Sequence, residues 1–292
     1  MPTSGALAWR RFARHRMGLI GAAITIGFVA VAIFAPLIAP HPYDKTNLFK
    51  PTVPPGRLPE HPLGTDELGR DLLSRLIFGA RVSLTVAAVV QVVVLMVGLL
   101  LGFAAGWLGG VVDFVIGRLL EVIGALPGLL FQMLIVLLLQ RYTQDSVLVV
   151  VVAIAALAWP IYVRLVRAQV MTVKEREFVE AARSLGAGTA FIAVRHILPH
   201  LTGPLIVAIT SAIGLTGFIT AEATLSFFGY GINEPLPSWG KMIGDSVRFI
   251  QRFQHLALYP VLCLMLLILG VSFLGDALRD ALDPTSERIG AQ

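Results

Sequence analysis

Six long apolar runs alternate with shorter polar segments along the chain. The runs cover residues 17–40, 82–106, 114–139, 147–166, 203–228 and 256–274. A helix needs about 20 apolar residues to cross the hydrocarbon core of a bilayer, so each run is long enough to span a membrane. The third run is the least regular, because Arg118 and Glu121 interrupt its start and Pro127 is expected to kink it. The pattern predicts an all-α, polytopic membrane protein with about six transmembrane helices.

The composition also indicates a membrane protein and excludes a soluble domain. Hydrophobic residues make up 56% of the chain and charged residues only 14%, whereas soluble domains carry roughly 25% charged residues. The net charge of +5 is modest, and nothing else in the sequence indicates nucleic-acid binding. The single cysteine, Cys263, lies in an apolar run and excludes a disulfide within the chain, so we expect a packing residue.

The polar segments set the predicted orientation. A basic segment, 1–16, precedes the first span, 17–40, which is too long for the apolar core of a cleaved secretory signal. Basic residues are concentrated in 1–16 and in the loop 167–202, and cytoplasmic loops of membrane proteins are enriched in Lys and Arg. With six spans, both termini and this loop are predicted to be cytoplasmic. The remaining regions are an extracytoplasmic loop (41–81), a five-helix core (82–275) that contains the loop 167–202, and a cytoplasmic tail (276–292).

The stretch from Glu175 to Pro199 is predicted to form two short helices outside the membrane. Apolar side chains recur at the spacing of one helical face, at Phe178, Ala181, Ala182 and Leu185. Gly186 and Gly188 are expected to end the first helix, since glycine adopts the left-handed cap conformation without a steric penalty. Thr189 is expected to cap the second helix and Pro199 to end it. Such a hairpin between spans predicts a surface that contacts something outside the membrane.

Small residues recur four apart in the second span, at Gly98, Gly102, Gly106 and Gly110. This spacing lets a second helix approach closely. The contact is expected either within the chain, as ordinary helix packing, or at a pore or subunit boundary.

No motif for catalysis, nucleotide binding or metal binding is visible. The Gly-Lys pair, Gly240 and Lys241, lacks the Ser or Thr that follows it in a phosphate-binding loop. The histidines show no metal-type Cys/His spacing, and no Ser-His-Asp arrangement is apparent. We therefore expect no enzyme, no cofactor and no metal site. Energy for uphill transport would come from an ion gradient or from another polypeptide.

Two carboxylates lie within or near the spans. A charge buried alone in hydrocarbon costs at least about 2.5–3.5 kcal/mol, so such residues usually face a bundle interior or a watery cavity. Glu222 lies inside the fifth run and is a candidate for the translocation pathway, with hydrogen bonding between spans or solvation near the outer surface as the alternatives. Glu121 is a second candidate for the pathway, with pairing to Arg118 or an interfacial position as the alternative.

Four stretches carry a recognisable pattern. Glu180-Ala181-Ala182 is followed after three residues by Gly186 and after nine more by His196-Ile197-Leu198-Pro199. The other three are HPLGTDELGRDLLSRLIFGARVSL (61–84), EATLSFFGYGINEPLPSWGKMI (222–243) and LGDALRDALDP (274–284). The first resembles the EAA loop of ABC importer permeases, EAA-x3-G-x9-I-x-L-P, and all four resemble the dipeptide/oligopeptide branch. This chain departs from the branch at His200, where Asn is usual, and at Glu121, where Asp is frequent.

The resemblance implies a type I ABC importer permease fold and ATP-driven import, most simply of dipeptides or oligopeptides. It implies a second homologous permease, two cytoplasmic ABC ATPases and an extracytoplasmic substrate-binding protein as partners, besides membrane lipid. ATP and Mg²⁺ would be bound by the ATPases. The location would be the cytoplasmic (inner) membrane of a bacterium or archaeon.

The resemblance also implies roles for particular residues. The EAA segment would be a coupling helix docked on an ATPase, and the matching positions here are Phe178, Glu180, Ala181, Ala182, Arg183, Leu185, Gly186, Leu198 and Pro199. The outer segments would dock the binding protein, with Pro235 and Pro237 in a structured loop and Trp239 at its interface. The cargo would cross between the two permeases, with Glu222 and Glu121 as candidate pathway residues.

Three alternatives stay open at this stage. The same machinery could import a nickel chelate, glutathione or an oligosaccharide instead of a peptide. An ion-driven secondary transporter fits six spans and an intramembrane carboxylate, but it does not explain the predicted hairpin at 175–199. A membrane scaffold without transport activity is the third alternative.

Overall fold

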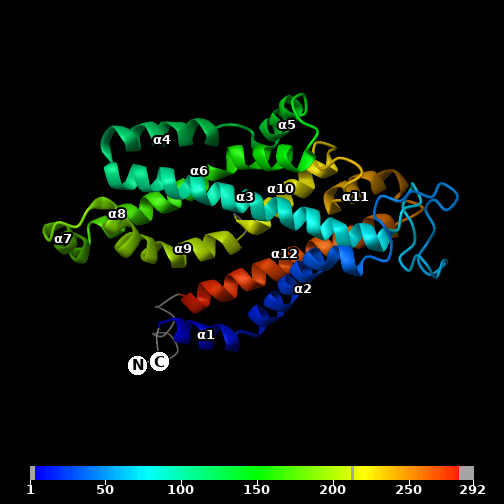
Figure 1. Ribbon diagram of the computed structural model, residues 1–292, viewed down its shortest axis with the longest axis horizontal. Coiled ribbons are helices and arrows are strands. Elements are labelled where there is room, and N and C mark those ends of the chain that lie inside the picture. Colours follow the sequence, from blue (N-terminus) through cyan, green and yellow to red (C-terminus); the bar gives the residue numbers. More distant parts are fainter. Residues whose placement is uncertain (1–3, 212–213, 283–292) are drawn as a thin grey trace.

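The computed structural model describes residues 4–211 and 214–282, and these are mainly helical (Figure 1). Two isolated β-bridges lie in the loop that precedes Leu72. The helices in chain order are α1 (Ser4–Arg14), α2 (Arg16–Ile38), α3 (Leu72–Leu108), α4 (Gly110–Gly124), α5 (Gly128–Leu139), α6 (Ser146–Lys174), α7 (Glu177–Ser184), α8 (Thr189–Ile192), a π-helical turn (Ala193–Ile197), α9 (Leu198–Thr210), α10 (Leu215–Phe227), α11 (Trp239–Ser246), a 3₁₀ turn (Val247–Phe249) and α12 (His255–Leu282). The predicted all-α class is confirmed.

The number of membrane spans also agrees with the hydrophobic pattern. Among the described residues, five helical segments are long and apolar enough to cross a bilayer, and the bent pair α4–α5 makes a sixth if it is one span. The fifth run, predicted at 203–228, instead belongs to a segment that starts at Thr189 and contains the separate helices α9 and α10.

Several helix boundaries differ from the sequence prediction. The second span begins at Leu72 and not near residue 82, because the carboxylate of Asp71 caps α3 by accepting a 2.7 Å hydrogen bond from the Ser74 N–H. The last span continues to Leu282, so the start of the predicted tail 276–292 is helical. The rest of that tail lies outside the described residues.

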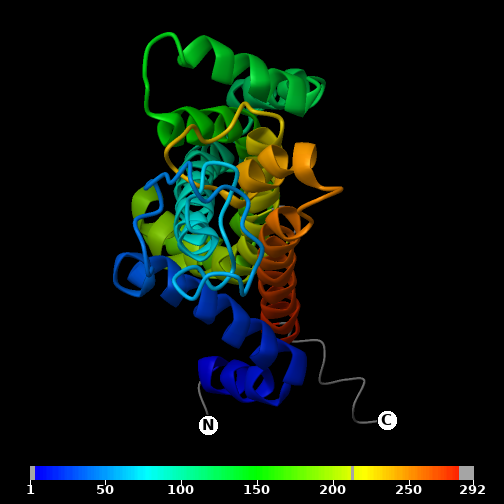
Figure 2. The same ribbon diagram turned by 90° about the vertical axis from the view of Figure 1, so that its right-hand side faces the viewer.

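The predicted kink at Pro127 is a sharp bend. α4 and α5 meet at 92°, because Pro127 lacks an N–H and its preceding residue is disfavoured in the helical conformation. The run 114–139 therefore contains a bend, as expected from Pro127, and forms two helices rather than one. Both helices lie at the periphery of the helix bundle, beside α3 and α6 (Figure 2).

The glycine face of α3 packs against α6. A Cβ atom at Gly98 would stand 2.4 Å from the Tyr162 Cβ, and one at Gly102 would stand 2.7 Å from the Val166 Cβ. Gly106 makes an equally close approach to α6, whereas a Cβ at Gly110 would meet nothing within 4 Å. Ordinary packing within the chain is thus the correct alternative for the first three glycines.

The helices place two groups of loops at opposite ends of the elongated molecule (Figure 1). The long loop between α2 and α3 lies at one end with α11, whereas α7 and α8 lie at the other. α1 and the end of α12 lie toward the same end as α7. This arrangement matches the predicted separation of the outer loops from the 167–202 loop.

Many apolar side chains point outward from the bundle. Leu37 of α2 is 81% exposed, Val111 of α4 is 78% exposed and Leu130 of α5 is 64% exposed. Such surfaces suit contact with lipid tails or with another membrane subunit, where apolar side chains need no burial within their own chain.

Candidate functional site

The short helix α7 stands between the long helix α6 and the segment α8–α9. It follows a break at the end of α6, where the Arg176 N–H bonds the Val173 carbonyl at 3.1 Å. Glu177 and Glu180 occupy its first turn and Arg183 its last, which complements the dipole of the helix. Val179 is fully buried and fastens α7 to the core of the chain.

Gly186 ends α7 in the predicted left-handed conformation. Its φ is +83°, its N–H bonds the Arg183 carbonyl at 3.0 Å, and the Ala187 N–H bonds the Ala182 carbonyl at 3.0 Å. This pair of bonds is a Schellman motif, which satisfies carbonyls at the end of a helix. A Cβ at Gly186 would meet nothing within 4 Å, so the requirement for glycine comes from the backbone angle alone. Gly188 has no such angle and precedes α8.

The predicted coupling residues lie on two sides of α7. Phe178 is 40% exposed and Leu185 is 89% exposed, and Glu180, Ala181 and Arg183 are exposed beside them. Ala182 is half-buried and packs against the core of the chain. Leu185 and the exposed part of Phe178 thus give α7 an apolar surface that faces away from the chain.

The second half of the predicted hairpin continues into a membrane segment. Thr189 is the first residue of α8 and does not cap it, since Gly188 is the N-cap. Pro199 does not end a helix but lies at the start of α9, directly after the π-helical turn. Leu198 and Pro199 are therefore exposed at the start of α9 rather than on α7.

Polar contacts join this end of the molecule to α3. The Lys174 ammonium donates to the Gly106 carbonyl at 3.0 Å, and the Arg183 guanidinium lies 5.2 Å from the centroid of the Trp107 ring. The Arg167 guanidinium pairs with Asp113 of α4, with one bond of 2.6 Å. α7 and the end of α6 are thus joined to the end of α3, and α6 is joined to α4.

Phe178 also ties α7 to the segment that leads into α9. Its ring stacks on His200 with centroids 5.2 Å apart and an angle of 16° between the rings. His196 lies 5.9 Å from the same ring. His200, where Asn is usual in the branch that the sequence resembles, therefore contacts α7 directly.

Glu222 lies fully buried between α10 and α3. Its Oε2 accepts a 2.7 Å hydrogen bond from the Ser83 hydroxyl of α3, and its Oε1 accepts one of 2.7 Å from Ser226. The structure thus shows hydrogen bonding between helices, the alternative to a position in the pathway.

Glu121 forms a 2.6 Å ion pair with Arg118 one turn earlier in α4, and both side chains are exposed. Pairing with Arg118 was the alternative to a pathway role, and the structure shows this pair.

The segment predicted to dock a binding protein is only partly accessible. Pro235 is exposed, but Pro237 and Trp239 are buried. The indole N–H of Trp239 donates to the Leu76 carbonyl at 3.0 Å, and its ring packs edge-on against Phe28. The expectation that Trp239 lies at an interface is wrong, because α2 and α3 enclose it.

A charge cluster around two buried arginines joins the α2–α3 loop to the segment before α11. Arg70 pairs with Asp66 at 2.6 Å and with Glu234 at 2.5 Å, and Arg75 pairs with Asp66 at 3.2 Å. Sequence reasoning missed this cluster. The i,i+4 spacing of Asp66 and Arg70 was a visible signal, whereas Glu234 lies 164 residues from Arg70 and gave none. Three potential metal ligands, His41, His61 and Asp71, also lie together, although no metal-type spacing predicted them.

Comparison with known proteins identifies the family of the chain. The model of the binding-protein-dependent transport system inner membrane component matches residues 98–288. The chain belongs to this family. The model of the N-terminal transmembrane domain of oligopeptide transport permease C matches residues 3–55.

Curated relatives cover nearly the whole permease. The dipeptide transport system permease protein DppC of Alkalihalophilus pseudofirmus is 38% identical over 95% of this chain and 88% of its own length. The glutathione transport system permease protein GsiD of Shigella dysenteriae is 39% identical, and that of Shigella flexneri 40%, each over 94% of this chain and 89% of its own. The chain is therefore a membrane-spanning permease of an ABC importer, and its relatives are transport proteins rather than enzymes.

Proposed function

We propose that this permease is half of the translocation unit of an ATP-driven importer of short peptides. Relatives that share almost its whole length are named for dipeptide transport and for glutathione transport. Glutathione is itself a short peptide, so both names denote one class of cargo. Glutathione, and less closely a nickel chelate or an oligosaccharide, stays the alternative to dipeptides.

The exposed surface of α7 is the observation that carries the proposed mechanism. Phe178 and Leu185 project from a short helix whose exit is fixed by Gly186, at the end of the molecule opposite the long α2–α3 loop. A cytoplasmic ATPase subunit that receives these side chains would move α7 when ATP closes the ATPase pair. The Arg183–Trp107 and Lys174–Gly106 contacts would carry this movement into α3.

The remaining parts of the proposal follow from this assignment. The cargo would pass between this chain and a second, homologous permease, and two ATPases would bind ATP and Mg²⁺, so that this chain needs no cofactor. Both termini would lie in the cytoplasm of a bacterium or archaeon. The α2–α3 loop and the segment around Pro235 would face an extracytoplasmic binding protein.

Reconstitution in liposomes tests the proposal. The chain is combined with its partner permease, the two ATPases and the binding protein, and uptake of a labelled dipeptide and of labelled glutathione is measured. We expect uptake only when ATP is on the ATPase side and the binding protein is on the opposite side. Transport by this chain alone, driven by an ion gradient, would contradict the proposal.

A further inference from the structure

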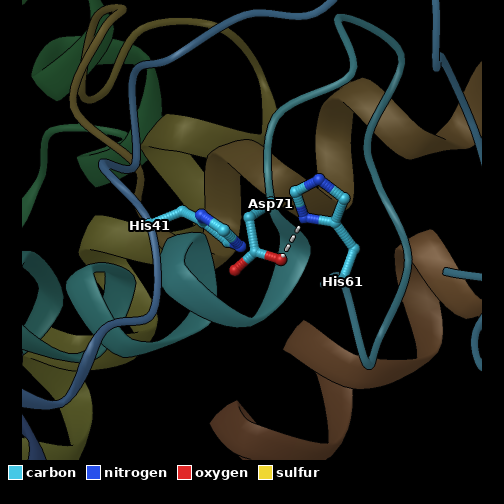
Figure 3. Close-up of side chains that lie close together, drawn as sticks. All are labelled: His41, His61 and Asp71. Atoms are coloured by element: carbon cyan, nitrogen blue, oxygen red, sulfur yellow. Dashed lines mark hydrogen bonds and ion pairs between the residues drawn. The ribbon is translucent and has the colours of Figure 1, made fainter. Parts of the chain in front are cut away.

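Three side chains with metal-binding atoms meet at the outer end of the permease, in the loop between α2 and α3. His41 follows α2, His61 lies in the middle of the loop and Asp71 caps α3. One ligand atom from each lies within 4.8 Å of the other two. The His61 ring bonds the Asp71 carboxylate, and the centroids of the His41 and His61 rings lie 4.7 Å apart (Figure 3). The cluster thus joins three parts of the loop at one point.

The spacing of the cluster suits a small transition-metal ion. Zinc binds imidazole nitrogen and carboxylate oxygen at about 2.0–2.2 Å, so tetrahedral ligand atoms stand roughly 3.3–3.5 Å apart. The His61 Nδ1 lies 2.9 Å from the Asp71 Oδ1, and no pair of ligand atoms exceeds 4.8 Å. These distances bracket the required spacing, so shifts of about 1 Å would complete three zinc ligands.

The surrounding contacts hold the ligands in place. The second oxygen of Asp71, Oδ2, accepts 2.7 Å hydrogen bonds from the Ser74 N–H and hydroxyl, which leaves Oδ1 for the site. The His41 N–H donates to the Ser74 hydroxyl at 3.1 Å, and the His41 ring lies 2.7 Å from the Glu60 carbonyl through Nε2. Such outer contacts orient metal ligands and are typical of metal sites.

The setting gives an ion access and a free coordination position. Asp71 is buried and the His61 side chain is 13% exposed, but the cluster borders a surface cavity that Lys45, Asn47 and Lys50 also line. The Lys50 ammonium is paired with the Glu60 carboxylate, which reduces its repulsion of a cation. Water from this cavity can supply a fourth ligand.

We propose that His41, His61 and Asp71 bind one Zn²⁺ ion, which fastens the α2–α3 loop to the start of α3. Two imidazoles and one carboxylate favour zinc over Ca²⁺ and Mg²⁺, because those ions prefer oxygen ligands alone. The proposal does not depend on the cargo or on the role of α7.

Zinc binding by the purified full chain, in its complex and without a polyhistidine tag, tests the site. We expect one tightly bound Zn²⁺ ion at micromolar metal, little competition from Mg²⁺ or Ca²⁺, and a rise in melting temperature when zinc is added. The variants His41→Ala and His61→Ala should each weaken binding about tenfold or more. His196→Ala is the matched control, since His196 lies at the opposite end of the molecule, and it should bind zinc as the wild type does.

Separate readouts keep the test decisive if a variant is unstable. His41→Asn removes the imidazole without touching the His61–Asp71 bond, so its fold should survive and its zinc affinity should fall. Co²⁺ added in place of zinc should give the visible absorption of a four-coordinate site in the wild type and not in His41→Asn. Wild-type protein that binds no zinc, or wild-type affinity in both His41 variants, would overturn the proposal.

Discussion

Single buried polar side chains join the helices of this permease. Glu222 accepts hydrogen bonds from Ser83 on α3 and from Ser226 on its own helix, so both of its carboxylate oxygens are satisfied. A buried donor or acceptor that loses its partner costs about 1–3 kcal/mol. The group formed by Glu222 and the two serines therefore stabilises the α3–α10 contact only while it is complete.

Substitutions at Glu222 separate a structural role from a role in the pathway. Glu222→Ala should lower the free energy of unfolding by about 1–3 kcal/mol, because Ser83 and Ser226 lose their partner. Glu222→Gln keeps the shape and a hydrogen-bonding group and should cost less. Both variants should keep the wild-type KM for cargo, measured by uptake alongside thermal unfolding. A changed KM in Glu222→Gln with an unchanged melting temperature would place Glu222 in the pathway.

Two carboxyls of the α2–α3 loop respond to pH in opposite directions. Burial, and then the neighbouring Asp66, raises the pKa of Glu67, whereas the hydrogen bond from Lys50 lowers the pKa of Glu60. A raised pKa in the folded state means that the contribution of Glu67 to stability is present below about pH 4.5 and lost as the pH rises through the folded pKa. The contribution of Glu60 is present above about pH 4.5 and is lost as the pH falls.

Melting curves between about pH 4.5 and pH 7.5 test these signs. Glu67→Gln should be more stable than the wild type at neutral pH, and the difference should shrink toward the acidic end. Glu60→Gln should instead be less stable than the wild type at neutral pH. Equal pH profiles for Glu67→Gln and the wild type would show that the burial of Glu67 has no energetic consequence.

At the scale of helices, close packing of α3 on α6 forms the centre of the bundle. The contact depends on glycines, because a side chain at Gly98, Gly102 or Gly106 would overlap α6. Without a strong hydrophobic driving force between helices in lipid, such close backbone approach is a main source of stability.

A pair of matched substitutions measures this contribution. Gly102→Ala would place its Cβ 2.7 Å from the Val166 Cβ and 2.9 Å from the Val163 carbonyl oxygen, and should destabilise the protein by about 1–3 kcal/mol. Gly117→Ala on α4 meets nothing within 4 Å and should be neutral or stabilising by about 0.5–1 kcal/mol. Thermal unfolding in detergent compares them, and equal melting temperatures would contradict the packing argument.

Backbone conformations that depend on a single residue could be predicted from the sequence. Contacts between residues far apart in the chain could not. The left-handed end of α7 followed from Gly186, because only glycine adopts a φ of +83° without a penalty. The burial of Trp239 could not be predicted, since Phe28, Leu76 and Gly79 that enclose it lie about 160 or more residues away in the chain. Pro127 predicted a kink. The 92° angle between α4 and α5 could not be predicted, because it depends on how both helices pack on their neighbours.

At the scale of the whole molecule, the two ends carry different chemistry. One end has a polar loop fixed by the Asp66–Arg70–Glu234 cluster and by the His41–His61–Asp71 group. The opposite end has α7 with its exposed apolar side chains. The hydrophobic pattern and the placement of basic residues predicted this polarity, because both are properties of the sequence itself. The identity of the partners could not be predicted in this way, since their surfaces belong to other chains.

We propose that α7 couples ATP hydrolysis on a partner subunit to transport through this chain. Two proline substitutions, two residues apart, test this coupling role. Gly186→Pro demands a φ near −65° where the backbone has +83°, and it removes the N–H that closes the end of α7. Gly188→Pro is the control, because the φ at Gly188 is −71° and a side chain there has open space.

The measurement is the number of cargo molecules imported per ATP hydrolysed by the complete complex in liposomes. We expect that Gly186→Pro assembles into the complex but hydrolyses ATP with little or no uptake, whereas Gly188→Pro keeps the wild-type ratio. A wild-type ratio in Gly186→Pro would contradict the coupling role of α7.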